Sequence, residues 1–270
     1  MLRLEVLIST CRPEGITRVA AMTLPRVRGV GYLVSWQQSE GEPVPRSIAE
    51  RDDIRVTRNE VTCLSANRNH ALSEATGEVL LIADDDLSFT REGLEGVIGA
   101  FALRPSMQMA LFRFDGAEKS YPDVETSLTR AIPKGFYASS IEIALRRECL
   151  ADPRLRFPTD FGLGARYGCG EEEIFLHTGR RLGLDVRFIP HTVCRHDGPS
   201  TGSASRVADS TLRGYGATIA LLYPTTWLPR LLLKAFRGHR SDRMGLLHGL
   251  RIMTGAAFSA TFKVRRPWRG

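Results

Sequence analysis

The 270-residue sequence contains no apolar run near the roughly 18 residues that a membrane-spanning helix needs. Its five cysteines are scattered and include no CxxC pair, so neither a disulfide framework nor a zinc ribbon is supported. The apolar stretch 6–8 stops at Arg12-Pro13, without the small-residue cleavage pattern of a secretory signal. We therefore expect a reduced, cytoplasmic protein.

Acidic residues are nearly absent from residues 230–270. This segment has ten Lys or Arg against one acid, Asp242, a net charge of +9, so the first 229 residues carry −2 of the total +7. Leucines and aromatic residues alternate with these cations at mixed helical spacing. The pattern favours an interfacial helix on an anionic membrane over a nucleic-acid-binding arm. The alternative is one or two helices packed on the main domain with a solvated basic face.

Composition is that of a globular protein, with 43% hydrophobic and 25% charged residues. We expect one domain over residues 1–205 and a helical, basic, amphipathic extension over 206–270. The Gly- and Ser-rich stretch 198–206 is typical of a flexible loop between them.

Strand and helix patterns alternate along the first part of the chain. Apolar segments predict strands at 4–9, 32–36, 54–57, 78–83, 107–114 and 185–189, and helical spacing predicts helices at 16–24, 65–75 and around 94–101. This order predicts an α/β fold, a mostly parallel sheet with helices on both faces. Ligands of such sheets bind outside the carboxyl ends of the strands.

Three carboxylates follow one of these strands directly. Asp84, Asp85 and Asp86 come after the apolar run 79–82. Three neighbouring acids repel one another unless a cation or cationic side chain compensates them, and oxygen ligands suit Mg²⁺ or Mn²⁺. The sequence thus predicts a functional site here; the alternative is an acidic, solvated turn.

A second acidic group follows a pair of glycines. Gly168 and Gly170 precede the run 171–173, in which Glu171 and Glu172 open a helical pattern. A carboxylate at this point can act as general base on a hydroxyl. The alternative is that acids in a first helical turn simply complement the helix dipole.

Two basic side chains are weaker candidates. Arg68, near the start of helix 65–75, can pair with a phosphate or be an ordinary surface arginine. His196 can complete a metal site or be a solvated loop residue.

Taken in order, these segments resemble a family 2 glycosyltransferase with a GT-A-like (Rossmann-like) fold. The matching segments are 6–13, 64–69, 81–86, 161–164 leading into 170–172, and His196 with 200–202. The resemblance covers about residues 1–205 and leaves the basic extension unassigned. It implies metal-dependent, inverting transfer of a sugar from a nucleotide-diphosphate donor, with a UDP-sugar expected, to a hydroxyl of a glycan or lipid-linked acceptor.

The resemblance also implies roles for individual residues. Thr10 and Arg12 would lie against the nucleotide base, Arg68 would hold the nucleotide or diphosphate, and Asp84 and Asp85 would bind the nucleotide-sugar, Asp84 towards the ribose.

On the reaction side, Asp86 and His196 would bind Mn²⁺ or Mg²⁺. Glu172 would be the catalytic base, at a position where the family usually has Asp, and Glu171 would be the acid before it. The acidic cluster that the family has after its second strand is replaced by residues 35–38, which suggests different base recognition.

Other functions stay open. A sugar-phosphate nucleotidyltransferase would use similar acids but wants a Gly-rich phosphate loop after the first strand, where residues 10–15 supply one glycine. A catalytically silent nucleotide-sugar-binding or membrane-binding module is a further alternative. We expect no nucleic-acid partner; we expect a cytoplasmic protein peripheral on the cytoplasmic face of an anionic membrane.

Overall fold

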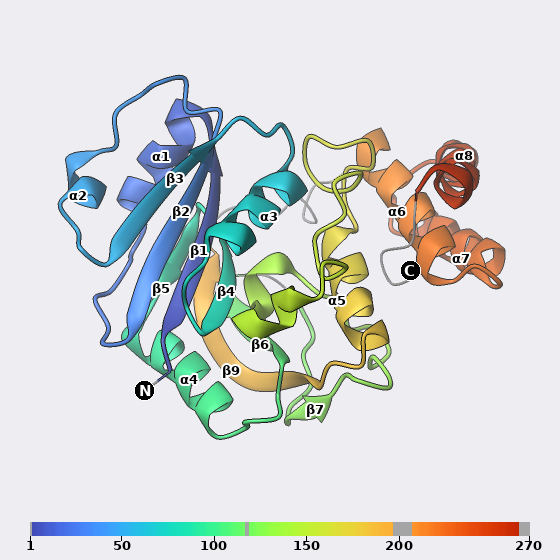
Figure 1. Ribbon diagram of the computed structural model, residues 1–270. Coiled ribbons are helices and arrows are strands. Elements are labelled where there is room, and N and C mark those ends of the chain that lie inside the picture. Colours follow the sequence, from blue (N-terminus) through green and yellow to red (C-terminus); the bar gives the residue numbers. More distant parts are fainter. Residues whose placement is uncertain (1, 117–118, 197–206, 265–270) are drawn as a thin grey trace.

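A mixed β-sheet forms the centre of the computed structural model, which describes residues 2–116, 119–196 and 207–264 (Figure 1). Its strands are β1 (Leu4–Cys11), β2 (Val30–Gln37), β3 (Ile54–Asn59), β4 (Val79–Asp84), β5 (Leu87–Phe89), β6 (Met109–Asp115), β7 (Thr126–Ser127), β8 (Ile143–Arg146) and β9 (Val186–His196). The order β3-β2-β1-β4 is parallel throughout. Beyond it, β8 runs antiparallel to β4 and β6, whereas β9 is parallel to β6. The strands β5 and β7 pair antiparallel with β9.

Helices cover both faces of the sheet, as expected for the α/β class. They are α1 (Arg12–Ala21), α2 (Arg46–Ala49), α3 (Leu64–Glu74), α4 (Arg91–Ala102) and α5 (Glu171–Arg181), with 3-10 turns at Ser140–Glu142 and Arg147–Ala151. Val6 and Ile8 of β1 pack in one core with α1 and α4, whereas Leu7 packs in a second core with α3 and α5. Successive side chains of a strand point to opposite faces, so a strand buried on both sides reads as a continuous apolar run.

The predicted elements of the first domain are confirmed with shifted ends. The helix predicted over 16–24 begins at Arg12, because Pro13 occupies its first turn, where a missing N–H costs nothing. The strand predicted over 185–189 continues to His196. The short strands β5, β7 and β8 were not predicted, since segments of two to four residues carry no periodic signal. The predicted loop at 198–206 lies outside the described residues.

Three C-terminal helices pack beside α5: α6 (Asp209–Leu222), α7 (Trp227–Arg240) and α8 (Leu246–Lys263) (Figure 1). Residues of α6 and α8 form a core with Phe161, Tyr167 and Ile174, so the extension is attached to the first domain. A further core joins all three helices. Among the described residues, none of the helices is long and apolar enough to cross a membrane.

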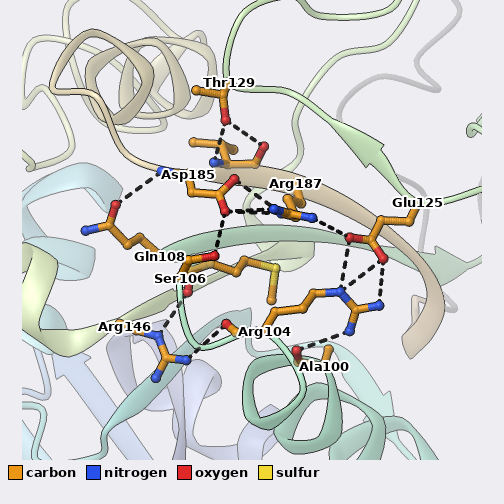
Figure 2. A network of polar contacts seen from close by, with 11 residues as sticks. Ala100, Arg104, Ser106, Gln108, Glu125, Thr129, Arg146, Asp185 and Arg187 are labelled. Atoms are coloured by element: carbon orange, nitrogen blue, oxygen red, sulfur yellow. Dashed lines mark hydrogen bonds and ion pairs between the residues drawn. The ribbon is translucent and has the colours of Figure 1, made fainter.

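An ion-pair network fixes the segment between β6 and β8 (Figure 2). Glu125 pairs with Arg104 after α4 at 2.6 Å and with Arg187 of β9 at 3.0 Å. Arg187 also pairs with Asp185 at 3.0 Å. These side chains are about a third exposed, so each pair adds little stability. Through Glu125, the network anchors the chain that leads from β6 to β8. Further along, the same chain contributes Ser140 to the candidate site.

Candidate active site

The parallel pairing of β1 with β4 brings two predicted motifs together. Ser9 is in register with Asp84, so Thr10 and the three aspartates leave the sheet at the same edge. Each aspartate has a different partner. Arg68 compensates the charge of Asp84 and Arg18 that of Asp85, whereas Asp86 contacts His196.

Asp85 is held by α1. Thr10 Oγ1 donates to Asp85 Oδ2 at 2.5 Å, and Arg18 Nη2 pairs with the same oxygen at 2.8 Å. A Cβ at Gly15 would collide with Thr10 Oγ1, so glycine permits this close approach of helix and strand. Thr10 and Asp85, both predicted to bind the nucleotide-sugar, therefore touch each other.

Arg68 is the centre of a buried cluster of carboxylates. Its side chain is 2% exposed and lies 2.9 Å from Asp84, 3.2 Å from Glu171 and 3.4 Å from Glu172. Arg68 Nη2 also donates to Ser140 Oγ at 2.7 Å. Burial acts to lower the pKa of Arg68, but the carboxylates of Asp84, Glu172 and Glu171 outweigh it and raise this pKa. One guanidinium thus links α3, β4 and the start of α5.

The asparagines beside Arg68 have structural partners. Asn67 Nδ2 donates to the backbone oxygens of Thr10 and Ser35, each at 3.0 Å, and so ties the ends of β1 and β2 to α3. Asn69 exchanges two hydrogen bonds with the backbone of Phe157, each 2.8 Å long. The motif at 67–69 positions the strand ends around Arg68.

Glycines shape the start of α5. Gly170 is the N-cap with φ 106°, a left-handed conformation that favours glycine. Gly162, with φ 97°, lies against the Glu171 carboxyl, which a Cβ there would meet at 3.0 Å. Burial, with the charge of Glu172 adding to it, raises the pKa of Glu171, although Arg68 opposes this. The Glu171 side chain is 5% exposed and that of Glu172 is 20% exposed, so Glu172 is the one accessible to a ligand.

Asp86 and His196 meet because β5 pairs with β9. Leu87 is in register with His196, and His196 Nε2 lies 3.1 Å from Asp86 Oδ2. Partial burial and the charges of Asp84 and Asp85 raise the pKa of Asp86, whereas His196 opposes this.

The separation of these two atoms suits adjacent ligands of one small cation. Bonds of about 2.1 Å at a right angle place two ligand atoms about 3 Å apart. No group of three or more His, Cys, Asp or Glu suited to a metal occurs in the described part of the chain.

A cavity of about 670 Å³ opens beside the ends of β1, β2 and β3. It is lined by Arg12, Pro13, Glu14, Gln38, Glu40, Gly41 and Glu60. Arg12, Gln38 and Glu40 have φ values of 62°, 53° and 53°, which is unusual for residues with side chains. Trp36 Nε1 donates to the Arg12 backbone oxygen at 2.9 Å and so helps hold that conformation.

Among the charged residues of this cavity, only Arg12 was predicted to bind the donor. Residues 35–38 stand where the family has its acidic cluster. Ser35 and Trp36 are buried within β2, and Gln38 is the one of these residues that lines the cavity. Glu14, Glu40 and Glu60 could have been predicted as cavity residues because each follows the carboxyl end of one of the parallel strands β1, β2 and β3.

A buried ion pair fixes the segment before Ser140. Lys119 Nζ lies 2.5 Å from Glu142 Oε1, and these side chains are 1% and 0% exposed. Tyr121 OH donates to the same carboxylate at 2.6 Å. Burial lowers the pKa of Lys119 and raises that of Glu142, although each stabilises the other's charge. Glu173 accepts a hydrogen bond from the Ala138 N–H at 3.1 Å, which joins this segment to α5.

The mixed α/β fold is GT-A-like. Residues 42–145 match the model of glycosyl transferase family 2. No curated protein matches the sequence.

Solved structures of S. aureus TarS share the fold. Residues 1–349 of TarS are 15% identical, with a TM-score of 0.57 over 98% of this chain and 73% of that one. The complex of TarS 1–349 with UDP is 16% identical, with a TM-score of 0.62 over 97% and 81%. The complex with UDP-GlcNAc is 17% identical, with a TM-score of 0.57 over 98% and 74%.

Proposed function

We propose that the protein is a metal-dependent, inverting glycosyltransferase that uses a UDP-sugar and glycosylates a hydroxyl of a glycan or glycolipid. The observation that carries this proposal is the cluster around Arg68, which joins Asp84 at the strand end to Glu172 at the start of α5. The Arg68 side chain thereby holds both Asp84, at the sheet edge proposed to bind the donor, and Glu172, the proposed catalytic base. The choice of UDP rests on the TarS complexes with UDP and UDP-GlcNAc.

In this proposal, the cavity lined by Arg12 receives the nucleotide end of the donor. Asp85 contacts Thr10, which lies two residues before Arg12 of this cavity. The polar cavity walls and the unusual backbone at Arg12, Gln38 and Glu40 are typical of a ligand site. Arg68 is buried among carboxylates, so we assign it to positioning Asp84 and Glu172, in addition to the phosphate contact that the resemblance implies.

Asp86 and His196 would hold Mn²⁺ or Mg²⁺, with the donor diphosphate and water as the remaining ligands, and this cation would neutralise charge on the leaving diphosphate. Glu172 takes the proton of the acceptor hydroxyl. The hydroxyl oxygen then bonds to the anomeric carbon as the bond from that carbon to the diphosphate oxygen breaks, which inverts the configuration. Since both substrates must be aligned, most of the catalytic effect comes from positioning.

The alternatives fit the site less well. A nucleotidyltransferase needs cations for a triphosphate after β1, but this cavity is lined by three glutamates, Glu14, Glu40 and Glu60, against one arginine. A catalytically silent binding module would have no need for a carboxylate such as that of Glu172, which is accessible and is held in place by the buried Arg68.

We also propose that the enzyme is peripheral on the cytoplasmic face of the membrane, where a lipid-linked acceptor is found. The basic, amphipathic extension supports this location.

Thermal denaturation with UDP-, GDP- and TDP-sugars, each with and without Mn²⁺, tests the donor. A ligand at 100 times its Kd should stabilise the fold by about 2.7 kcal/mol. Stabilisation by one nucleotide class, dependent on metal, supports the proposal. Transfer of labelled sugar to membrane extracts then tests turnover. Lack of any shift and of any transfer contradicts the donor assignment.

A further inference from the structure

Helix α7 exposes apolar side chains on its outer surface. Leu228, Leu232, Leu233 and Phe236 are 48%, 48%, 49% and 50% exposed. Three of these, Leu228, Leu232 and Phe236, are spaced four residues apart and therefore form one stripe along the helix. We call these four residues the α7 stripe. An exposed apolar stripe on a surface helix marks an interaction site.

A neighbouring face of α7 is already used for packing. Leu231 and Ala235 are fully buried in the core that joins α6, α7 and α8. Trp227 contacts Phe258 of α8, with ring centroids 5.3 Å apart. Because other residues fix the helix, the α7 stripe is not needed to hold it. The apolar surface of α7 is therefore wider than the face that packs on α6 and α8, and its outer part is open to a partner.

Cations border the α7 stripe on one side. Arg230, Lys234 and Arg237 are exposed and lie at positions i, i+4 and i+7 of the helix. Arg230 lies over the Tyr223 ring at 3.8 Å from its centroid, and Lys234 lies over Tyr215 at 4.0 Å. These rings of α6 hold the two charges on the flank of the helix. We call the three cations the basic flank.

The partner must accept apolar side chains and positive charge together. The sequence of α7 contains no Asp or Glu, so nothing in the helix repels an anionic partner. A bilayer with anionic lipid offers a hydrocarbon layer for the stripe and phosphate headgroups for the flank. A second copy of the chain would instead bring two basic flanks together.

We propose that α7 docks on an anionic membrane surface through the α7 stripe and the basic flank. This inference assigns a surface to the membrane association proposed above. It does not depend on the donor, so it can fail while the glycosyltransferase proposal stands. Helices α6 and α8 then serve to fix α7 on the catalytic domain.

Vesicle flotation of the full chain tests this assignment. The variant Leu232→Gln/Phe236→Gln removes the centre of the stripe without touching the packed face. The matched control is Leu103→Gln/Val124→Gln, which changes side chains that are 80% and 68% exposed elsewhere. We expect the unmodified chain and the control to float with phosphatidylglycerol-containing vesicles at low salt. The stripe variant should lose about tenfold or more in vesicle partitioning.

A charge variant and neutral vesicles complete the test. Arg230→Gln/Arg237→Gln should weaken partitioning and its salt dependence, and pure phosphatidylcholine should bind all proteins weakly. Equal flotation of the stripe variant and the unmodified chain overturns the proposal. A second result would also overturn it: light scattering shows a dimer, and the stripe variant abolishes the dimer without changing flotation. In that case a second copy of the chain covers the stripe. Donor-induced thermal stabilisation should be equal in all variants.

Discussion

Arg68 and Glu171 form an ion pair of 3.2 Å in which both side chains are almost completely buried. They are 103 residues apart in the sequence, in α3 and α5. Such a pair contributes little net stability over an apolar replacement, but removing one partner leaves an uncompensated charge. Its effect is to fix the start of α5, and with it Glu172, relative to Asp84.

The first prediction concerns the stability of this cluster. Arg68→Met should lower the free energy of unfolding by about 3–5 kcal/mol, because Asp84, Glu171 and Glu172 lose their shared cation. Urea denaturation followed by circular dichroism measures the change. As a control, Arg18→Gln breaks a pair whose arginine is 51% exposed and should cost at most about 1 kcal/mol. A similar small loss for Arg68→Met would contradict the cluster's role.

The second prediction concerns metal-dependent donor binding. Asp86→Asn should abolish the Mn²⁺-dependent part of donor affinity, because a neutral amide replaces the charged ligand beside His196. Titration calorimetry with and without Mn²⁺ measures it. Asp52→Asn, at a carboxylate whose side chain is 86% exposed, is the control and should bind as the unmodified chain does. Unchanged metal dependence in Asp86→Asn would refute the assignment.

The third prediction identifies the catalytic base among three adjacent glutamates. Glu172→Gln should keep donor affinity and lose turnover by roughly 10²–10⁴-fold, since the amide cannot accept the acceptor's proton. Glu173→Gln is the matched control, because Glu173 bonds to the Ala138 N–H and should retain turnover within about tenfold. Steady-state kinetics with saturating donor separates the two, and an active Glu172→Gln enzyme would rule Glu172 out.

The fourth prediction concerns acid stability. His177 of α5 is 8% exposed, and its Nε2 has no hydrogen-bond partner. Burial, with Arg180 and Arg181 adding to it, lowers the pKa of His177 from 6.5 to about 4. The unfolded chain therefore takes up this proton at higher pH than the folded one. Stability is then lost as pH falls from about 6.5 towards 4, by up to about 3 kcal/mol.

His177→Phe removes this titration and an unpaired polar atom. Its free energy of unfolding should fall less steeply between pH 6.5 and 4 than that of the unmodified chain, as measured by urea denaturation at several pH values. His248→Phe is the control, since His248 is exposed and pairs with Asp209 at 2.7 Å. Equal acid sensitivity of His177→Phe and the unmodified chain would show that another group is responsible.

The sequence alone determined the fold class and the sheet edge at which the candidate site lies. Continuous apolar runs such as 79–82 reveal strands buried on both faces, and polar residues directly after them must lie at the carboxyl edge of a parallel sheet. The approximate positions of Thr10, Asp84 and Glu172 followed from this rule and from the resemblance. The functional roles of these residues stay predictions.

Only the tertiary structure decided which partners these residues have. The sequence left Arg68 as either a phosphate ligand or a surface arginine. It is buried among Asp84, Glu171 and Glu172, which the sequence could not show because contacts across 103 residues leave no periodic signal. The sequence likewise showed that the extension 206–270 is basic and rich in apolar residues. It did not show which of its apolar side chains pack in the core between α6, α7 and α8. The fold buries Leu231 and leaves Leu232 exposed, since the direction of each side chain depends on where α6 and α8 lie.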